Sequence, residues 1–279
     1  MGDCKYCGQP AGLFRTKHKA CQEKHDTGWA QMLALARDAA SGKANLEEMT
    51  PALTSIAAAS FIPPEQVQEA TVAGWEGAVD HFVDDGALSE DEEKHLVGYT
   101  ERFSLDRAVL DRNGAHTKVV KGAVLRDLMN GVVPHRVKLQ GSLPFNFMPS
   151  EQLVWVFQDV KYYEDKTRRQ YVGGYSGVSV RVAKGLYYRT GGFRGQPVET
   201  TERILADIGT VAVTTKHLYF AGTIKSFRIR HDKIVSFTPY SDGVLLQRDA
   251  QTAKPQIFVT GDGWFTHNLL ANIGNATGS

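Results

Sequence analysis

The chain has 279 residues, of which 42% are hydrophobic and 23% are charged, and its formal net charge is +1. This composition is typical of a globular protein of about two domains, and the near-neutral charge excludes a protein that binds nucleic acid or membranes through its overall charge. The sequence has no run of about 18 apolar residues that could span a membrane and no apolar signal-peptide core at its start. Three cysteines are too few for a disulfide framework, so we expect a reduced, cytoplasmic protein with a metal site.

All three cysteines lie near the start of the chain. Cys4 and Cys7 have the C-x2-C spacing with which a tight turn presents two thiolates to one zinc ion, and Cys21 supplies a third. The fourth ligand is either His18 or His25, because on a helix both lie on the same face as Cys21. We favour His18, since its H-x2-C pair repeats the C-x2-C spacing and resembles the second ligand pair of small treble-clef or zinc-ribbon fingers. We therefore predict one zinc bound by these three cysteines and His18.

Basic and aromatic residues surround these ligands. If His18 binds zinc, His25 is free to act as a general acid or base. Tyr6 and Phe14 supply aromatic faces among the cations, a combination suited to phosphate contact and base stacking. The alternative is a solvated basic face on a small finger. The residues that we expect to contact RNA are Arg15, Lys17, Lys19 and Lys24.

Residues 29–132 are expected to form a helical domain. Helix starts are indicated by capping residues and prolines, and apolar side chains recur every three or four positions. The expected helices are 29–40 capped by Thr27, 46–60 capped by Asn45, one opening at Pro63 and Pro64, one capped by Ser89 with Glu92, and one over 122–131.

The acidic loop at 83–93 superficially resembles a calcium loop. We reject an EF-hand, because His81 and Val83 stand where calcium needs side-chain oxygens. The run DDGALSEDEEKHL instead resembles the helix-turn-helix of TerB-like helical domains, and this resemblance covers about residues 30 to 105.

From residue 133 the sequence is rich in β-branched and aromatic residues. The glycine-rich stretch 172–198 has no phosphate-loop motif, and we expect bulges and tight turns there. The segments VAVTTKHLYFAG and IVSFTPYSDGVLLQ resemble a PH-like or GRAM-like domain over about residues 175 to 275. The expected strands are 136–141, 152–163, 178–183, 185–190, 210–214, 217–221, 225–230, 234–239, 243–248 and 256–260, followed by a helix at 262–273.

One strand and turn of this domain is basic. A lipid headgroup or nucleic acid could bind there, but we expect a solvated face, because the alternate residues Phe227 and Ile229 point into the core. The histidines at 116, 135, 217 and 267 are isolated in sequence, so we expect them to be structural or surface residues. The basic residues are Lys225, Arg228, Arg230, His231 and Lys233.

The expected fold is α+β and multidomain: a small zinc finger (1–28), an all-α helical middle (29–132) and an antiparallel PH-like β-barrel with a C-terminal helix (133–279). This architecture resembles that of phage-defence proteins of the ring-activated zinc-finger RNase type. The resemblance implies a bacterial stress or phage-defence sensor-effector that self-assembles on a protein trigger and uses its finger to bind RNA, with cleavage as a further step. The alternative is a non-enzymatic adaptor that binds a membrane or a protein through the PH-like domain; the first hypothesis does not favour a membrane partner.

Overall fold

The computed structural model describes residues 2–83, 88–137, 142–183, 186–250 and 253–277, and the side chains of 169–199 lie outside this description. The chain divides into two compact units, Met1–Arg136 and Val137–Thr277. The described residues form seven α-helices and one seven-stranded antiparallel sheet, which confirms the α+β multidomain fold. No helix in this part of the chain is long and apolar enough to cross a membrane. The finer division at residues 28 and 132 stays a prediction.

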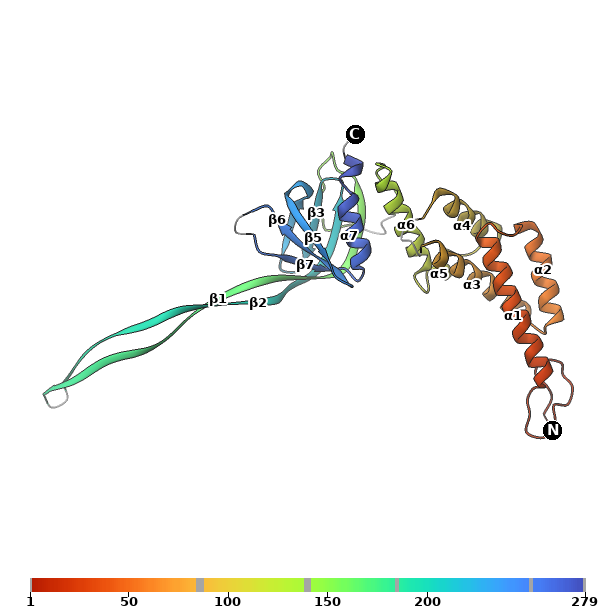
Figure 1. Ribbon diagram of the computed structural model, residues 1–279, viewed down its shortest axis with the longest axis horizontal. Helices are drawn as coiled ribbons and strands as arrows, with labels where there is room; N and C mark the ends of the chain where they lie inside the picture. The colour runs from red at the N-terminus through yellow and green to blue at the C-terminus, as the bar shows by residue number, and fades with distance from the viewer. Residues whose placement is uncertain (1, 84–87, 138–141, 184–185, 251–252, 278–279) are drawn as a thin grey trace. The chain divides into compact units, whose positions relative to one another are not determined.

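The first unit is helical (Figure 1). The helices Lys19–Ala40 and Pro64–Phe82 approach so closely that a Cβ atom added at Gly74 would lie 2.3 Å from the Cβ of Ala36. This contact therefore requires a glycine. The helices are α1 (Lys19–Ala40), α2 (Leu46–Ala59), α3 (Pro64–Phe82), α4 (Glu90–Arg102), α5 (Arg107–Leu110) and α6 (Ala115–Met129).

Two buried aromatic residues join α3 to α4 in the core of this unit. Trp75 is 2% exposed, and its indole N–H donates to the Leu96 carbonyl at 3.2 Å. The fully buried Tyr99 donates its hydroxyl to the Thr71 carbonyl at 3.0 Å. Each large ring thus adds apolar burial while its polar atom remains satisfied.

Several helix boundaries agree with the sequence. The Asn45 side chain accepts from the Glu47 backbone N–H at 2.9 Å, and α3 opens at Pro64. Ser89 and Glu92 form the reciprocal capping box at the start of α4. These predictions are confirmed, and each rests on a local signal within one helical turn: a side-chain cap at Asn45 and Ser89, and a proline at the first helical position of α3.

The expected start of the first helix at Thr27 is wrong. α1 begins at Lys19, with His18 as its N-cap residue, and continues through Thr27. Gly28 follows there and packs against Ser60, where an added Cβ would lie 2.1 Å from the Ser60 hydroxyl oxygen. This glycine therefore serves close packing inside the helix and does not mark a boundary.

The last helix of the unit is longer than expected. α6 begins at Ala115 instead of residue 122, after Gly114 breaks the preceding turn with a φ of 74°. The short helix α5 was not predicted. Residues 84–87 of the acidic loop lie outside the described residues.

The second unit is a curled antiparallel sheet with the order β4-β3-β2-β1-β7-β6-β5, and α7 packs against β5 and β6 (Figure 1). Aromatic rings fill its interior: the Tyr162 ring centroid lies 5.2 Å from that of Phe220 and 5.1 Å from that of Phe258. The elements are β1 (Leu153–Ala183), β2 (Leu186–Thr214), β3 (His217–Gly222), β4 (Ser226–Arg230), β5 (Ile234–Pro239), β6 (Gly243–Arg248), β7 (Gln256–Val259) and α7 (Gly263–Asn272).

The strands expected between 217 and 260, and the helix after them, are confirmed to within about two residues. The strands expected at 178–183 and 185–190 are instead the ends of one long hairpin made by β1 and β2. The strand expected at 136–141 is absent at 136–137, and its other residues lie outside the described residues.

Of the bulges expected in the glycine-rich stretch, the described residues show one register shift, between Arg181 and Ala183, and the glycine pairs themselves lie in a regular ladder. The β1–β2 register runs without a shift from the Tyr163–Leu205 pair to the Arg181–Tyr187 pair. Glycines lie opposite glycines, as in the pair Gly177–Gly191.

Candidate metal centre

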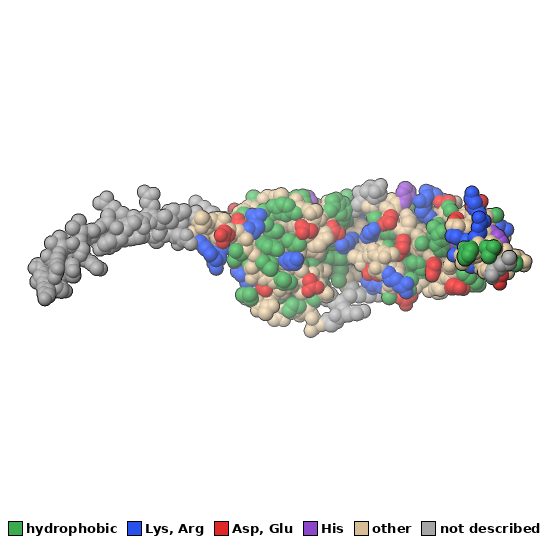
Figure 2. Space-filling model, turned by 90° about the horizontal axis from the view of Figure 1, so that it is seen from below, with side chains coloured by type: hydrophobic (Ala, Val, Ile, Leu, Met, Phe, Trp, Pro, Cys, Tyr) green, Lys and Arg blue, Asp and Glu red, His purple; other side chains and the backbone are tan. Residues whose placement is uncertain are grey.

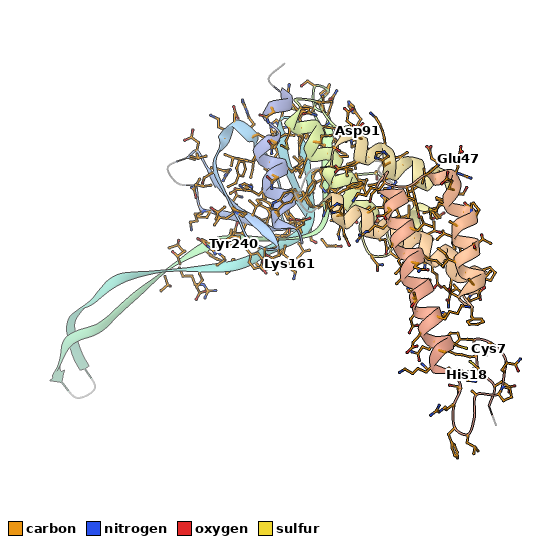
Figure 3. The ribbon with its side chains drawn as sticks, turned by 45° about the vertical axis from the view of Figure 1, so that its right-hand side comes forward. Cys7, His18, Glu47, Asp91, Lys161 and Tyr240 are labelled. Carbon is orange, nitrogen blue, oxygen red and sulfur yellow. The ribbon has the colours of Figure 1, made fainter. Side chains whose placement is uncertain are left out.

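The cysteine-rich segment folds into a compact cluster at the start of α1. The ligand atoms of Cys4, Cys7, His18 and Cys21 all lie within 4.8 Å of one another. Cys7 and His18 lie beside each other at the N-terminal end of α1 (Figure 3). Three sulfurs and one imidazole nitrogen gathered in this way can bind a metal ion.

A tight turn brings the first two cysteines together. The Gly8 N–H donates to the Cys4 carbonyl at 2.8 Å, and Gly8 has a φ of 72°, which a glycine adopts without strain. The Cys4 N–H in turn donates to the Gln9 carbonyl at 2.8 Å. Gly8 therefore supports the C-x2-C turn expected from the sequence.

The His18 ring is oriented for metal binding. Its Nδ1 lies 3.4 Å from the Cys7 Sγ and 3.7 Å from the Cys21 Sγ. A tetrahedral zinc with ordinary bond lengths places neighbouring sulfur and nitrogen ligands about 3.5 Å apart. The other ring nitrogen, Nε2, lies 3.1 Å from the Pro10 carbonyl oxygen, and such a bond fixes the tautomer of a histidine ligand.

The thiols have unequal acidities. Burial alone would raise the pKa of Cys4, but backbone N–H donors from Cys7, His18 and Tyr6 lower it to about 6. Burial and the neighbouring Cys7 and Cys4 raise the pKa of Cys21 to about 11. Thiolates this close repel one another, and a bound cation removes the repulsion, so the donor set fits a zinc ion.

His25 lies outside the cluster, four residues beyond Cys21 on α1. Its ring centroid lies 4.8 Å from that of Tyr6, its Nδ1 lies 3.3 Å from the Asp26 carboxylate, and its side chain is 19% exposed. Of the two histidines that the sequence left open, the structure places His18 in the cluster and His25 beside it.

The four cations expected to contact RNA do not share one face. Arg15 and Lys17 lie in the loop that carries the ligands, and Lys19 begins α1 with its side chain 90% exposed. Lys24 lies five residues further on, about 140° around the helix from Lys19, with its Nζ 5.2 Å from the centroid of the Phe61 ring. The loop and the start of α1 are therefore the better candidate RNA contact.

The loop also presents apolar side chains to solvent. Phe14 is fully exposed and has a φ of 62°, and Leu13 beside it is 70% exposed. Figure 2 shows Lys and Arg side chains next to apolar ones at the end of the molecule that carries the N-terminus.

Sequence reasoning missed a second polar cluster, in the β-rich unit. His217, expected to be an isolated structural histidine, has its Nδ1 2.6 Å from the carboxylate of Glu151, which is fully buried. The two residues are 66 positions apart, so no local pattern links them. The cations of the expected basic strand do not share one environment, because Lys225 pairs with Glu164 at 2.9 Å while Arg228 and Arg230 are exposed.

Comparison of the chain with protein-family models and with curated proteins found no match. The resemblances to TerB-like domains and to phage-defence ribonucleases therefore have no support beyond the residues that suggested them.

Proposed function

We propose that the N-terminal segment is a zinc finger that binds single-stranded RNA. The observation that carries this proposal is the exposed loop of Phe14, Arg15 and Lys17, held between metal-ligand candidates on both sides. An exposed aromatic ring can stack on a base, and each cation can pair with a phosphate. Because the ligands fix the loop at both ends, little conformational entropy is lost when RNA binds.

Salt-dependent binding tests this proposal. We expect the zinc-loaded full chain to bind a single-stranded RNA in fluorescence anisotropy, with an affinity that falls as salt rises. The double variant Arg15→Gln with Lys17→Gln should reduce the salt slope by about two. The matched control is Lys43→Gln with Arg102→Gln, two exposed cations elsewhere in the same unit. Equal binding by both double variants would contradict the proposal.

RNA cleavage is a further step of the same proposal, and His25 is its candidate general base. The imidazole takes the proton of a ribose 2′-hydroxyl, and the 2′ oxygen attacks the adjacent phosphorus. The bond to the 5′ oxygen breaks, and this oxygen takes the proton back from the imidazolium, which leaves a cyclic phosphate. The contact between His25 and Asp26 supports the role, because a carboxylate can orient an imidazole.

The His25→Ala variant separates cleavage from binding. We expect it to lose cleavage while it keeps its zinc and its RNA affinity. The control His81→Ala removes an exposed histidine of α3 and should cleave like the parent. If the parent binds RNA and leaves it intact, the finger is a binding module only.

For the β-rich unit we propose a role in assembly, in which a protein trigger brings copies of the chain together as a stress or phage-defence sensor-effector. β4 and β5 are the two edge strands of the sheet. β1 pairs with β7 only up to Glu164, and β2 pairs with β3 only from Gly209, so most of the hairpin has strand edges open to another chain. Light scattering of the full chain, alone and with a candidate trigger, tests this role, and a monomer under every condition would contradict it.

The second candidate is a non-enzymatic adaptor that binds a partner protein through the same edges. It is favoured because the finger has few groups for acid–base catalysis: among its described residues, His25 is the one histidine outside the ligand cluster. Retained assembly in a variant that no longer binds RNA, together with no cleavage by the parent, would favour the adaptor.

A further inference from the structure

The outer face of β3 and β4 carries a group of polar residues. His217 lies opposite Arg230 in the β3–β4 ladder, and Tyr219 lies opposite Arg228. Residues two apart on a strand, and residues directly opposite across a ladder, share one face of a sheet. These four side chains therefore lie together, whereas the alternate residue Ile229 is buried on the other face.

Glu151 holds this face in place from the segment that precedes β1. Its carboxylate accepts from the Thr214 hydroxyl at 2.9 Å and from the Tyr219 hydroxyl at 3.0 Å, and it contacts the His217 Nδ1 at 2.6 Å. The other nitrogen of His217, Nε2, has no hydrogen-bond partner among the described residues. A carboxylate that holds one imidazole nitrogen leaves the other to face a ligand in a defined direction.

A cavity of about 460 Å³ opens over this face. Beside His217 and Arg228 it is lined by Lys216, by His231, and by the pair of Arg230 with Asp232 at 2.6 Å. A second cavity, of about 310 Å³, shares His217 and both arginines.

The charge of this region is positive. Asp232 pairs with Arg230, and the Glu151 carboxylate contacts His217, so neither carboxylate pairs with the other cations around the cavity. No ion pair within the described part of the chain engages the four remaining cations. These are Lys216, Arg228, Lys233 and Arg248.

One buried polar atom in the cavity wall is unsatisfied. The His231 Nε2 lies 2.8 Å from the Thr214 carbonyl oxygen, while its Nδ1 is buried without a partner. Burial lowers the pKa of His231, so its neutral ring donates through Nε2 and can accept a hydrogen bond at Nδ1. Buried polar atoms are nearly always satisfied, and a water that donates an O–H would satisfy this one.

We propose that this cavity binds a phosphomonoester group. Arg228, Lys216 and His217 come from different parts of β3, β4 and the turn before β3, so they can donate to several oxygens of one tetrahedral anion. A carboxylate is planar and is matched by a single arginine fork. A phosphodiester in a nucleic-acid chain continues on both sides, whereas a terminal phosphate can enter a recessed cavity with three oxygens free. This site is independent of the finger and of its proposed RNA binding.

Calorimetry with small probes tests the proposal. Phenyl phosphate should bind the full chain at low salt, and methyl phenyl phosphate and benzoate should bind at least about tenfold more weakly, because each lost charge-assisted hydrogen bond has about this effect. Arg228→Gln should weaken phenyl phosphate binding by at least about tenfold. The control Arg203→Gln removes a half-exposed arginine of the same sheet and should have no effect. Equal binding of the three probes, or equal effects of the two variants, would overturn the proposal.

Vesicle sedimentation decides whether the phosphomonoester belongs to a lipid headgroup or to a soluble ligand. Sedimentation with vesicles that carry a phosphatidylinositol phosphate, and not with phosphatidylcholine alone, would identify a lipid headgroup, provided that Arg228→Gln abolishes it. Phenyl phosphate binding without sedimentation would identify a soluble ligand. If Arg228→Gln lowers the unfolding temperature, Lys216→Gln replaces it, since Lys216 contributes only a surface hydrogen bond to Ser150 at 2.9 Å. No phenyl phosphate binding by the folded parent would refute the site.

Discussion

Replacement of His18 should separate the two histidines near the metal centre. We expect His18→Ala to weaken zinc binding by more than about 100-fold, since even the loss of an outer partner of a ligand costs about 10- to 100-fold. His25→Ala should bind zinc like the parent, because its ring contacts Tyr6 and Asp26 and not the ligands. His18→Cys should bind zinc more tightly than His18→Ala, because a thiolate can replace the imidazole as a ligand although it does not fill the same space.

The loss of zinc should unfold the finger, and the structure gives the scale. Among residues 2–18 only Cys4 and Ala11 are buried, and burial of two such small side chains stabilises the fold by about 1–3 kcal/mol. Structural zinc contributes about 10 kcal/mol or more to the folding of small fingers. A bound zinc would therefore be the main source of order in this segment, whereas the helical core, anchored by Trp75 and Tyr99, should keep its unfolding temperature without it.

Two assays check this prediction. Competition with a zinc chelator of known affinity measures metal binding, and limited trypsin digestion measures the order of the segment, because Arg15 and Lys17 are cleavage sites within it. Digestion should be fast in His18→Ala and in the chelated parent, and slow in zinc-loaded parent and His25→Ala. Zinc loss in His25→Ala with retention in His18→Ala would show that the ligand assignment is reversed, and slow digestion without zinc would refute the argument from burial.

The remaining predictions concern pH and the helical core. As pH is lowered, zinc affinity should fall about tenfold per pH unit for each proton that the metal displaces. Near neutral pH Cys4, with its pKa of about 6, is already ionised, whereas Cys21, with a pKa of about 11, must lose its proton. Chelator competition at several pH values should therefore show weaker zinc binding in acid. Tyr99→Phe should lower the free energy of unfolding by about 1 kcal/mol, because it removes the buried bond to the Thr71 carbonyl, as urea denaturation would measure. Asn45→Ala should lower the free energy of unfolding by about 0.5–2 kcal/mol through the loss of the α2 cap, and an unchanged urea midpoint would contradict this prediction.

The parts of the structure that the sequence predicted depend on short-range chemistry. The ligand cluster spans residues 4 to 21, and the capping box joins Ser89 to Glu92 within one turn. The short strands after residue 217 are rich in β-branched and aromatic residues and are separated by turns, so their positions could be read from the sequence.

What the sequence could not show depends on distant partners. Thr27 suggested the start of a helix, but α1 continues through it, and the close contact of Gly28 with Ser60 explains why a glycine lies inside α1. Gly177 pairs with Gly191 in a ladder whose register shifts only near its end, between Arg181 and Ala183, where the sequence suggested bulges at the glycines. His217 is isolated in sequence, and its surroundings are set by Glu151 and by the opposite strand, neither of which is visible in a local pattern.

The first unit links its metal centre to its core through one helix. α1 carries Cys21 in its first turn and buries Ala36, Ala39 and Ala40 near its other end. The helix rises about 1.5 Å per residue between these points, and Gly28 packs it against Ser60 at an intermediate point. The position of the finger relative to the helical core therefore depends on whether the metal orders the ligands around the N-terminus of α1. Without metal, Arg15 and Lys17 would lie on a flexible tail, and RNA binding would carry the full entropic cost of ordering it.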